Sequence, residues 1–107
     1  MIKLKFTLDQ RRRKKDGTFP LVLRVYYERR FLTLKTGICI LAKDWDEQKG
    51  RLRKSHPEHF TANNRLSDQE LELRSRLKSL SILYPQHFSF EQMKTILGGK
   101  DIQSDAL

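Results

Sequence analysis

Few residues of this 107-residue chain belong to the types that support catalysis or metal binding. The three histidines include His56 and His59, and the single cysteine is Cys39. Two imidazoles and one thiol fall short of the four ligands of a structural zinc site. Cys39 lies between two isoleucines, which is typical of a small buried apolar residue. The sequence has neither a Gly-rich phosphate loop nor paired carboxylates, so we expect no catalytic residue, metal or cofactor.

The chain is rich in positively charged residues. Lys and Arg number 22 against 13 Asp and Glu, which gives a formal net charge of +9. Residues 1–54 carry 16 basic and 6 acidic residues, whereas residues 55–107 carry 6 and 7. A concentrated basic surface attracts polyanions and gains affinity from counterion release. The plainer interpretation is a solvated surface that keeps the protein soluble.

The remaining composition limits the class of protein. No stretch approaches the roughly 18 to 20 apolar residues of a membrane span. The N-terminal segment alternates in polarity and has no apolar core of a secretory signal, and one cysteine cannot form an internal disulfide. We therefore expect a cytoplasmic protein without membrane contact. Hydrophobic residues make up 37%, which supports a small core with little room for a deep pocket.

Alternating polarity in the N-terminal third predicts an antiparallel sheet of three strands with one apolar face. The first strand is expected to extend into Arg11–Arg13. Asp16-Gly17 supplies the positive φ that a hairpin turn needs. The predicted strands cover residues 2–8, 19–28 and 31–36, joined by tight connections at residues 15–18 and 29–30.

The following residues predict a helical cover for that apolar face. Residues 37–60 form a connector in which Trp45 acts as a packing plug. A long helix is expected over residues 61–84, ended by Pro85, and a capping box predicts a short helix over residues 90–97. The apolar stripe of the long helix consists of Leu66, Leu73, Leu77, Leu80 and Tyr84.

These elements predict an α+β fold, a three-stranded antiparallel sheet packed against one long C-terminal helix and followed by a short second helix. We assign residues 1–84 to a single domain, with the sheet at 2–36, the connector at 37–60 and the helix at 61–84. Residues 85–107 are the short helix and a frayed tail or linker.

The polar face of the predicted sheet is the candidate binding surface. A β-ribbon fits the major groove of B-DNA and presents alternate side chains to base edges. Arg24 and Tyr26 lie mid-strand and are predicted to contact base edges, whereas the basic hairpin tip contacts phosphates. The predicted DNA-binding residues are Lys3, Lys5, Arg11, Arg13, Lys14, Lys15, Arg24, Tyr26, Arg30, Thr33 and Lys35.

The basic face has three other interpretations. Lysines on an edge strand prevent aggregation, but this explains only one or two cations. A protein-interaction module is suggested by Phe31 and by the apolar stripe of the helix. An RNA-binding sheet would carry interleaved stacking aromatics, and only Tyr26 and Phe31 qualify.

The order of these motifs resembles a known family. A basic strand and a Lys-Asp-Gly turn precede Pro20–Val25, and Thr36-Gly37-Ile38 is followed by Lys43-Asp44-Trp45-Asp46. This order, over residues 2 to about 80, is similar to the N-terminal arm DNA-binding domain of tyrosine recombinases, the integrases of phages and conjugative transposons. Phe31 lies in a third strand that is more apolar than this family's pattern.

The resemblance implies sequence-specific binding of double-stranded DNA, with the sheet in the major groove of arm-type sites. It implies that catalysis belongs to a separate C-terminal domain, so this chain is a non-catalytic fragment whose residues 85–107 lead toward an absent core-binding domain. The implied partners are DNA and other recombinase protomers in the full-length complex. The implied location is the bacterial cytoplasm, at the nucleoid. We expect the isolated domain to be a monomer.

Overall fold

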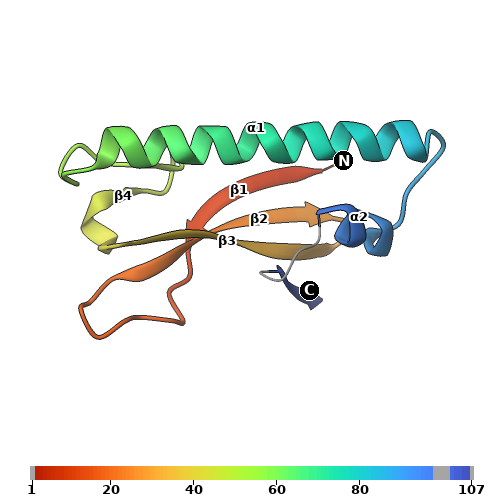
Figure 1. Ribbon diagram of the computed structural model, residues 1–107. Helices are drawn as coiled ribbons and strands as arrows, with labels where there is room; N and C mark the ends of the chain where they lie inside the picture. Colours follow the sequence, from red (N-terminus) through yellow and green to blue (C-terminus); the bar gives the residue numbers. More distant parts are fainter. Residues whose placement is uncertain (1, 98–101, 107) are drawn as a thin grey trace.

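The computed structural model describes residues 2–97 and 102–106. Its centre is an antiparallel meander of β1 (Lys3–Leu8), β2 (Phe19–Tyr27) and β3 (Arg30–Ile40), with the helix α1 (His59–Leu83) lying across one face (Figure 1). The predicted α+β class, with a three-stranded sheet, a long helix and a short second helix, is confirmed.

A fourth strand was not predicted. The segment β6 (Ile102–Ala106) pairs antiparallel with β3, which gives the strand order β1-β2-β3-β6. The expectation of a frayed tail is therefore wrong for residues 102–106, and its remainder lies outside the described residues. The physical reason is that the free edge of β3 offers unpaired backbone N–H and C=O groups to any extended segment within reach.

The core lies between the sheet and α1 (His59–Leu83). Alternate strand residues such as Phe6, Leu23 and Leu32 form one buried cluster with apolar residues of α1. Three residues of the predicted stripe, Leu66, Leu73 and Leu80, are buried, and Leu77 packs against them. Tyr84 instead caps the helix and is exposed, because a residue that precedes proline is disfavoured in helical conformation.

The short helix α2 (Phe90–Leu97) begins with the predicted capping box. The backbone N–H of Gln92 donates to Ser89 Oγ at 3.1 Å, and the N–H of Ser89 donates to Gln92 Oε1 at 2.8 Å. Phe90, Met93 and Leu97 are buried in the same core cluster as α1 and the sheet. The helix is therefore part of the packed body.

The start of α2 is attached to the hairpin between β2 and β3. This hairpin turns at Glu28 and Arg29, whose φ angles are 52° and 63°, one residue earlier than predicted. Tyr27 Oη donates to the carbonyl of Phe88 at 2.8 Å, and Glu28 accepts the N–H of Phe90 at 3.1 Å. Burial raises the pKa of Tyr27, and the charge of Glu28 adds to this, so the phenol keeps the proton that it donates.

A bulge in β3 explains the Thr-Gly-Ile motif. The pairing passes from Val22↔Lys35 to Leu21↔Ile38, so Thr36 and Gly37 have no partner positions on β2. Thr36 Oγ1 donates to the carbonyl of Leu21 at 2.6 Å and accepts the N–H of Ile38 at 3.1 Å. Gly37 has a φ of 79°, which favours glycine. The bulge lets β3 continue to Ile40, beyond its predicted end.

The connector after β3 is held by its own polar side chains. It contains a 3-10 turn (Ala42–Asp44) and the paired strands β4 (Trp45–Asp46) and β5 (Arg51–Leu52). Asp44 is buried and accepts a hydrogen bond from Ser55 Oγ at 2.6 Å. Trp45 is buried in the core cluster, which confirms its role as a packing plug.

The bulge leads to a stability prediction. Thr36→Val keeps the shape of the side chain but leaves the buried carbonyl of Leu21 without its donor. We expect the free energy of unfolding in urea to fall by about 1 to 3 kcal/mol. The matched variant Thr36→Ser keeps the hydroxyl and should retain most of this stability. Equal losses in the two variants would contradict the assigned role of the hydroxyl.

Candidate nucleic-acid interface

The sheet face turned away from α1 collects most of the predicted strand residues. The register places Lys3 beside Tyr26 and Lys5 beside Arg24, and then Arg24 beside Thr33. Because directly paired residues point to the same side of a sheet, these side chains share one face. We call this surface the outer face. It comprises Lys3, Lys5, Thr7, Val22, Arg24, Tyr26, Phe31, Thr33 and Lys35.

Side chains of the outer face differ in accessibility. Lys3, Lys5 and Lys35 are exposed, and Arg24 and Tyr26 are half-buried. Thr33 is only 4% exposed although it faces away from the core. The long cations are therefore the accessible groups, and Thr33 belongs to the floor of the face.

Arg24 occupies the middle of the outer face, on the central strand β2. Its Cζ lies 5.0 Å from the centroid of the Phe31 ring. Its Nε is buried and has no hydrogen-bond partner, and Arg24 forms no ion pair within the described residues. An arginine held in this way keeps its terminal nitrogens available for an external acceptor.

The basic loop between β1 and β2 is bent by a buried carboxylate. Asp9, only 3% exposed, accepts the backbone N–H of Arg11 at 3.2 Å and pairs with Arg12 Nε at 3.5 Å. β1 therefore ends at Leu8, and the expected extension of the strand into Arg11–Arg13 is wrong. This short polar side chain bonds its neighbouring backbone and so competes with the strand ladder.

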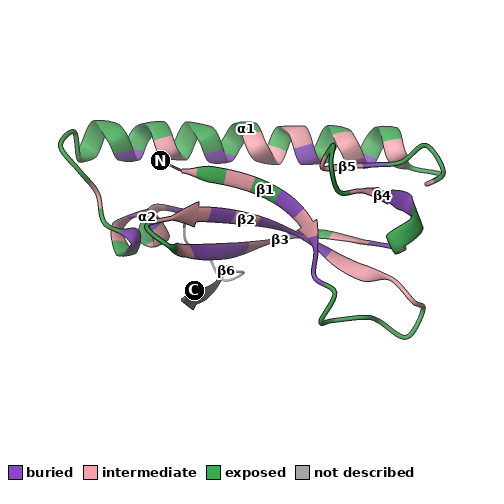
Figure 2. Ribbon diagram, turned by 180° about the vertical axis from the view of Figure 1, so that it is seen from behind, coloured by how far each residue is buried: buried purple, intermediate pink, exposed green. Residues whose placement is uncertain are grey.

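The tip of this loop forms the predicted turn. The N–H of Lys14 donates to the carbonyl of Thr18 at 2.8 Å, and Gly17 has a φ of 86°. Hydrogen bonds from the Thr18 side chain and backbone hold the pKa of Asp16 below its ordinary value. Residues 10–16 are exposed (Figure 2), so Arg13, Lys14 and Lys15 are accessible to a phosphate backbone.

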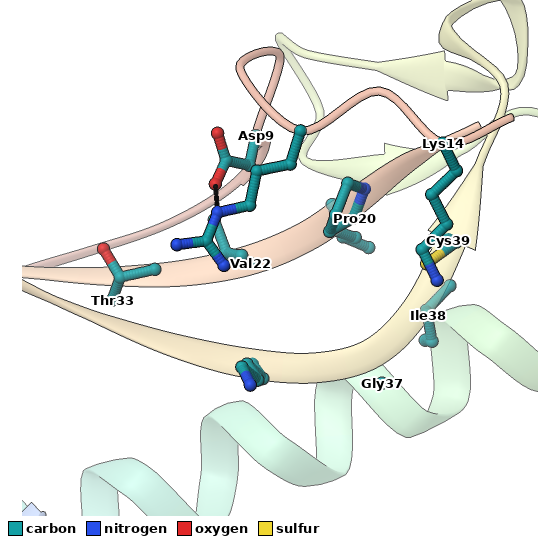
Figure 3. Close-up of a pocket in the computed structure, with 11 residues that line it drawn as sticks. Asp9, Lys14, Pro20, Val22, Thr33, Gly37, Ile38 and Cys39 are labelled. Atoms are coloured by element: carbon teal, nitrogen blue, oxygen red, sulfur yellow. Dashed lines mark ion pairs between the residues drawn. The ribbon is translucent and has the colours of Figure 1, made fainter. Parts of the chain in front are cut away.

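A pocket of about 380 Å³ separates this loop from β2 and β3 (Figure 3). Val22, Thr33 and Cys39 contribute to its lining, together with the cations Arg12, Lys14 and Lys35. Arg12 was not among the predicted binding residues, although it belongs to the charge run Arg11–Lys15. The pocket gives the outer face a concave basic end.

Glu47 limits the positive charge at the β1 side of the outer face. Its carboxylate pairs with Lys5 Nζ at 3.1 Å and accepts hydrogen bonds from Trp45 Nε1 at 2.8 Å and Thr7 Oγ1 at 3.2 Å. Burial raises the pKa of Glu47, but the hydrogen bonds from Trp45 and Lys5 outweigh it, and the pKa lies below its ordinary value. Lys5 is thus oriented by a partner.

Arg30 is placed apart from the other predicted residues. It pairs with Tyr27 in the register and lies on the helix side of the sheet. Its guanidinium is 4.0 Å from the centroid of the Phe90 ring and 3.4 Å from Glu91 Oε1. The structure thus brings Arg30 to the start of α2, where it attaches that helix to β3.

A sheet face that collects several cations attracts polyanions electrostatically. Among the described residues, no group of three His, Cys, Asp or Glu side chains could hold a metal ion, and no helix is long and apolar enough to span a membrane.

Comparison with known families assigns the chain to one of them. The family model of the arm DNA-binding domain matches residues 6–94, and the chain belongs to this family. The family is a group of non-catalytic DNA-binding modules found in phage integrases, so the resemblance seen in the sequence is confirmed. No curated protein and no solved structure matches the chain.

The environment of Glu47 leads to a pH prediction. A carboxyl whose pKa is lowered on folding stabilises the protein above its ordinary pKa, which is 4.5 here, and this contribution is lost as the pH falls through the lower folded value. We expect Glu47→Gln to lower the urea midpoint at about pH 7 by a small amount, because half of the side chain is exposed. As the pH falls below that folded value, the two midpoints should converge. A pH-independent gap would contradict this assignment.

Proposed function

We propose that this domain binds duplex DNA sequence-specifically by placing the outer face in the major groove of arm-type sites, as part of a site-specific tyrosine recombinase. The observation that carries the proposal is the shared face of Lys3, Lys5, Arg24, Tyr26 and Lys35. Membership in the arm DNA-binding family supports DNA as the partner.

The dimensions of the sheet support the docking mode. Neighbouring strands lie about 4.8 Å apart, so β1 to β3 span about 10 Å between their axes. The major groove of B-DNA is about 12 Å wide. The strands β1 to β3, which carry the outer face, therefore match the width of the groove when this face is turned toward the base pairs and α1 toward solvent. The strand β6, paired to the far edge of β3, then lies at the rim of the groove.

The proposed contacts divide by position. Arg24 and Tyr26, at the centre of the outer face, read base edges. Thr33, which pairs with Arg24 and lines the pocket, belongs to the floor of this face. Lys3, Lys5 and Lys35 lie at the flanks and contact phosphates. The loop cations Arg11, Arg13, Lys14 and Lys15 contact the backbone beyond the groove edge. Arg30, the first residue of β3, contacts the start of α2, and for it DNA contact stays a prediction.

The proposal extends to the setting of the domain. We place the arm-binding unit within residues 1–84, with α2 and β6 packed on it, and a connection toward a core-binding domain within residues 85–107. Arm binding lets one recombinase hold two DNA segments, and other protomers complete the recombination complex. The cellular setting is the bacterial cytoplasm, at the nucleoid. Affinity of the isolated domain, expected as a monomer, is modest because linked binding sites supply the rest.

The division of roles can be tested with a selected DNA site. A duplex enriched from a random-sequence pool is titrated beside a scrambled duplex, at about 50 and 200 mM salt. We expect Arg24→Ala to weaken binding to the selected duplex by about 1 to 3 kcal/mol with a smaller effect on the scrambled one. Lys15→Ala should weaken both equally and reduce the salt slope by roughly one unit.

Either of two results would contradict the proposal. If the wild-type domain enriched no sequence from the pool, sequence-specific binding would be wrong. If Arg24→Ala weakened both duplexes equally, base reading by the centre of the outer face would be wrong.

A further inference from the structure

Phe31 is an aromatic residue on the outer face that is nevertheless buried. The register pairs it with Tyr26 across β2 and β3, on the side away from α1. Its side chain is only 8% exposed. A ring that is so well covered has little surface left for a direct contact with DNA, so its position calls for another explanation.

The coverage of Phe31 includes two of the residues assigned to base reading. The Tyr26 ring lies 5.6 Å from the Phe31 ring between centroids, at an interplanar angle of 50°. Arg24 is the diagonal neighbour of Phe31, and its Cζ is 5.0 Å from the ring centroid. Both distances are within the range of favourable aromatic and cation–π contacts.

The same contact is associated with an unusual state of Arg24. Its Nε is buried with no hydrogen-bond partner, which a folded protein normally avoids because the lost hydration costs free energy. Because Nε is covered, a ligand cannot accept hydrogen bonds side-on from Nε and one terminal nitrogen. The two terminal nitrogens remain, and they form an end-on pair of donors.

We propose that Phe31 is a positioning residue that holds the guanidinium of Arg24 for end-on recognition of a guanine. Guanine presents two acceptors, O6 and N7, in the major groove, and a pair of parallel donors matches them. Phe31 itself does not touch the DNA. The inference rests on the proposed function and adds to it the base that Arg24 reads and the residue through which the arginine is oriented.

The proposal is tested by a double-mutant cycle of Phe31 and Arg24. The readout is the ratio of affinities for the selected duplex and for duplexes in which each guanine of that site is replaced in turn by adenine. We expect Phe31→Leu, which keeps an apolar side chain without a π face, to reduce one such ratio about threefold to fivefold. Phe31→Trp keeps the π face and should retain most of the ratio.

The Arg24→Ala background shows whether Phe31 changes the affinity ratio through Arg24. Arg24→Ala should abolish preference at the same guanine, and adding Phe31→Leu should then change the ratio no further. A merely structural role of Phe31 would lower affinity for all duplexes in both backgrounds. Urea unfolding of each variant provides the matched control for folding.

A spectroscopic measurement separates failure of this inference from failure of the proposed function. The Nε–H resonance of Arg24 in the free domain should be shifted by the ring current of Phe31, and the shift should disappear in Phe31→Leu. An unchanged resonance would overturn the inference even if the domain bound DNA specifically. An undiminished effect of Phe31→Leu in the Arg24→Ala background would overturn it as well. Absence of any sequence preference in the wild type would overturn the proposed function and, with it, the guanine assignment.

Discussion

Burial of one side of β2 is the constraint on which the rest of the structure depends. Leu21, Leu23 and Val25 are almost completely buried against the helix side of the sheet. Since side chains alternate along a strand, this burial directs Val22, Arg24 and Tyr26 to the opposite face. A shift of the register by one residue would bury Arg24 and expose the core, so the hydrophobic core itself specifies which residues can meet a ligand.

Alternation in the sequence predicted the three strands of the meander and the strand residues of the outer face, whereas the helices were predicted from helical spacing and a capping box. Other features were not readable, and three of them show why. Glu28 and Arg29 are not the residues that a turn with two positive φ angles normally contains, so the hairpin was expected one residue later. The bend at Asp9 depends on the contact between its buried carboxylate and Arg12. An alternating strand pattern does not reveal such a contact. The pairing of β6 joins segments about 70 residues apart, beyond any local pattern.

Burial also separates residues that look alike in the sequence. Phe31 continues the apolar run Phe31–Leu34, but its neighbour Leu32 is in the core, whereas Phe31 lies on the outer face. Similarly, the motifs on which the family resemblance was based have structural tasks. Thr36 and Gly37 form the bulge, Asp44 holds Ser55, and Trp45 fills the core. These motifs identify the scaffold, whereas DNA contacts are proposed for less distinctive lysines and arginines around them.

The attachment of α2 to the hairpin has a mechanical consequence. Tyr27, Glu28 and Arg30 each bind the segment Phe88–Glu91, at the end of β2 and β3 next to Tyr26 and Phe31. Tension applied to the chain beyond α2 is therefore borne by the pairing of β6 with β3 as well as by this hairpin, and both lead to the two strands that carry Arg24 and Thr33. The residues that anchor α2 lie on the helix side of the sheet, but they are sequence neighbours of Tyr26 and Phe31 on β2 and β3, so a load on the helix reaches the backbone of the binding surface.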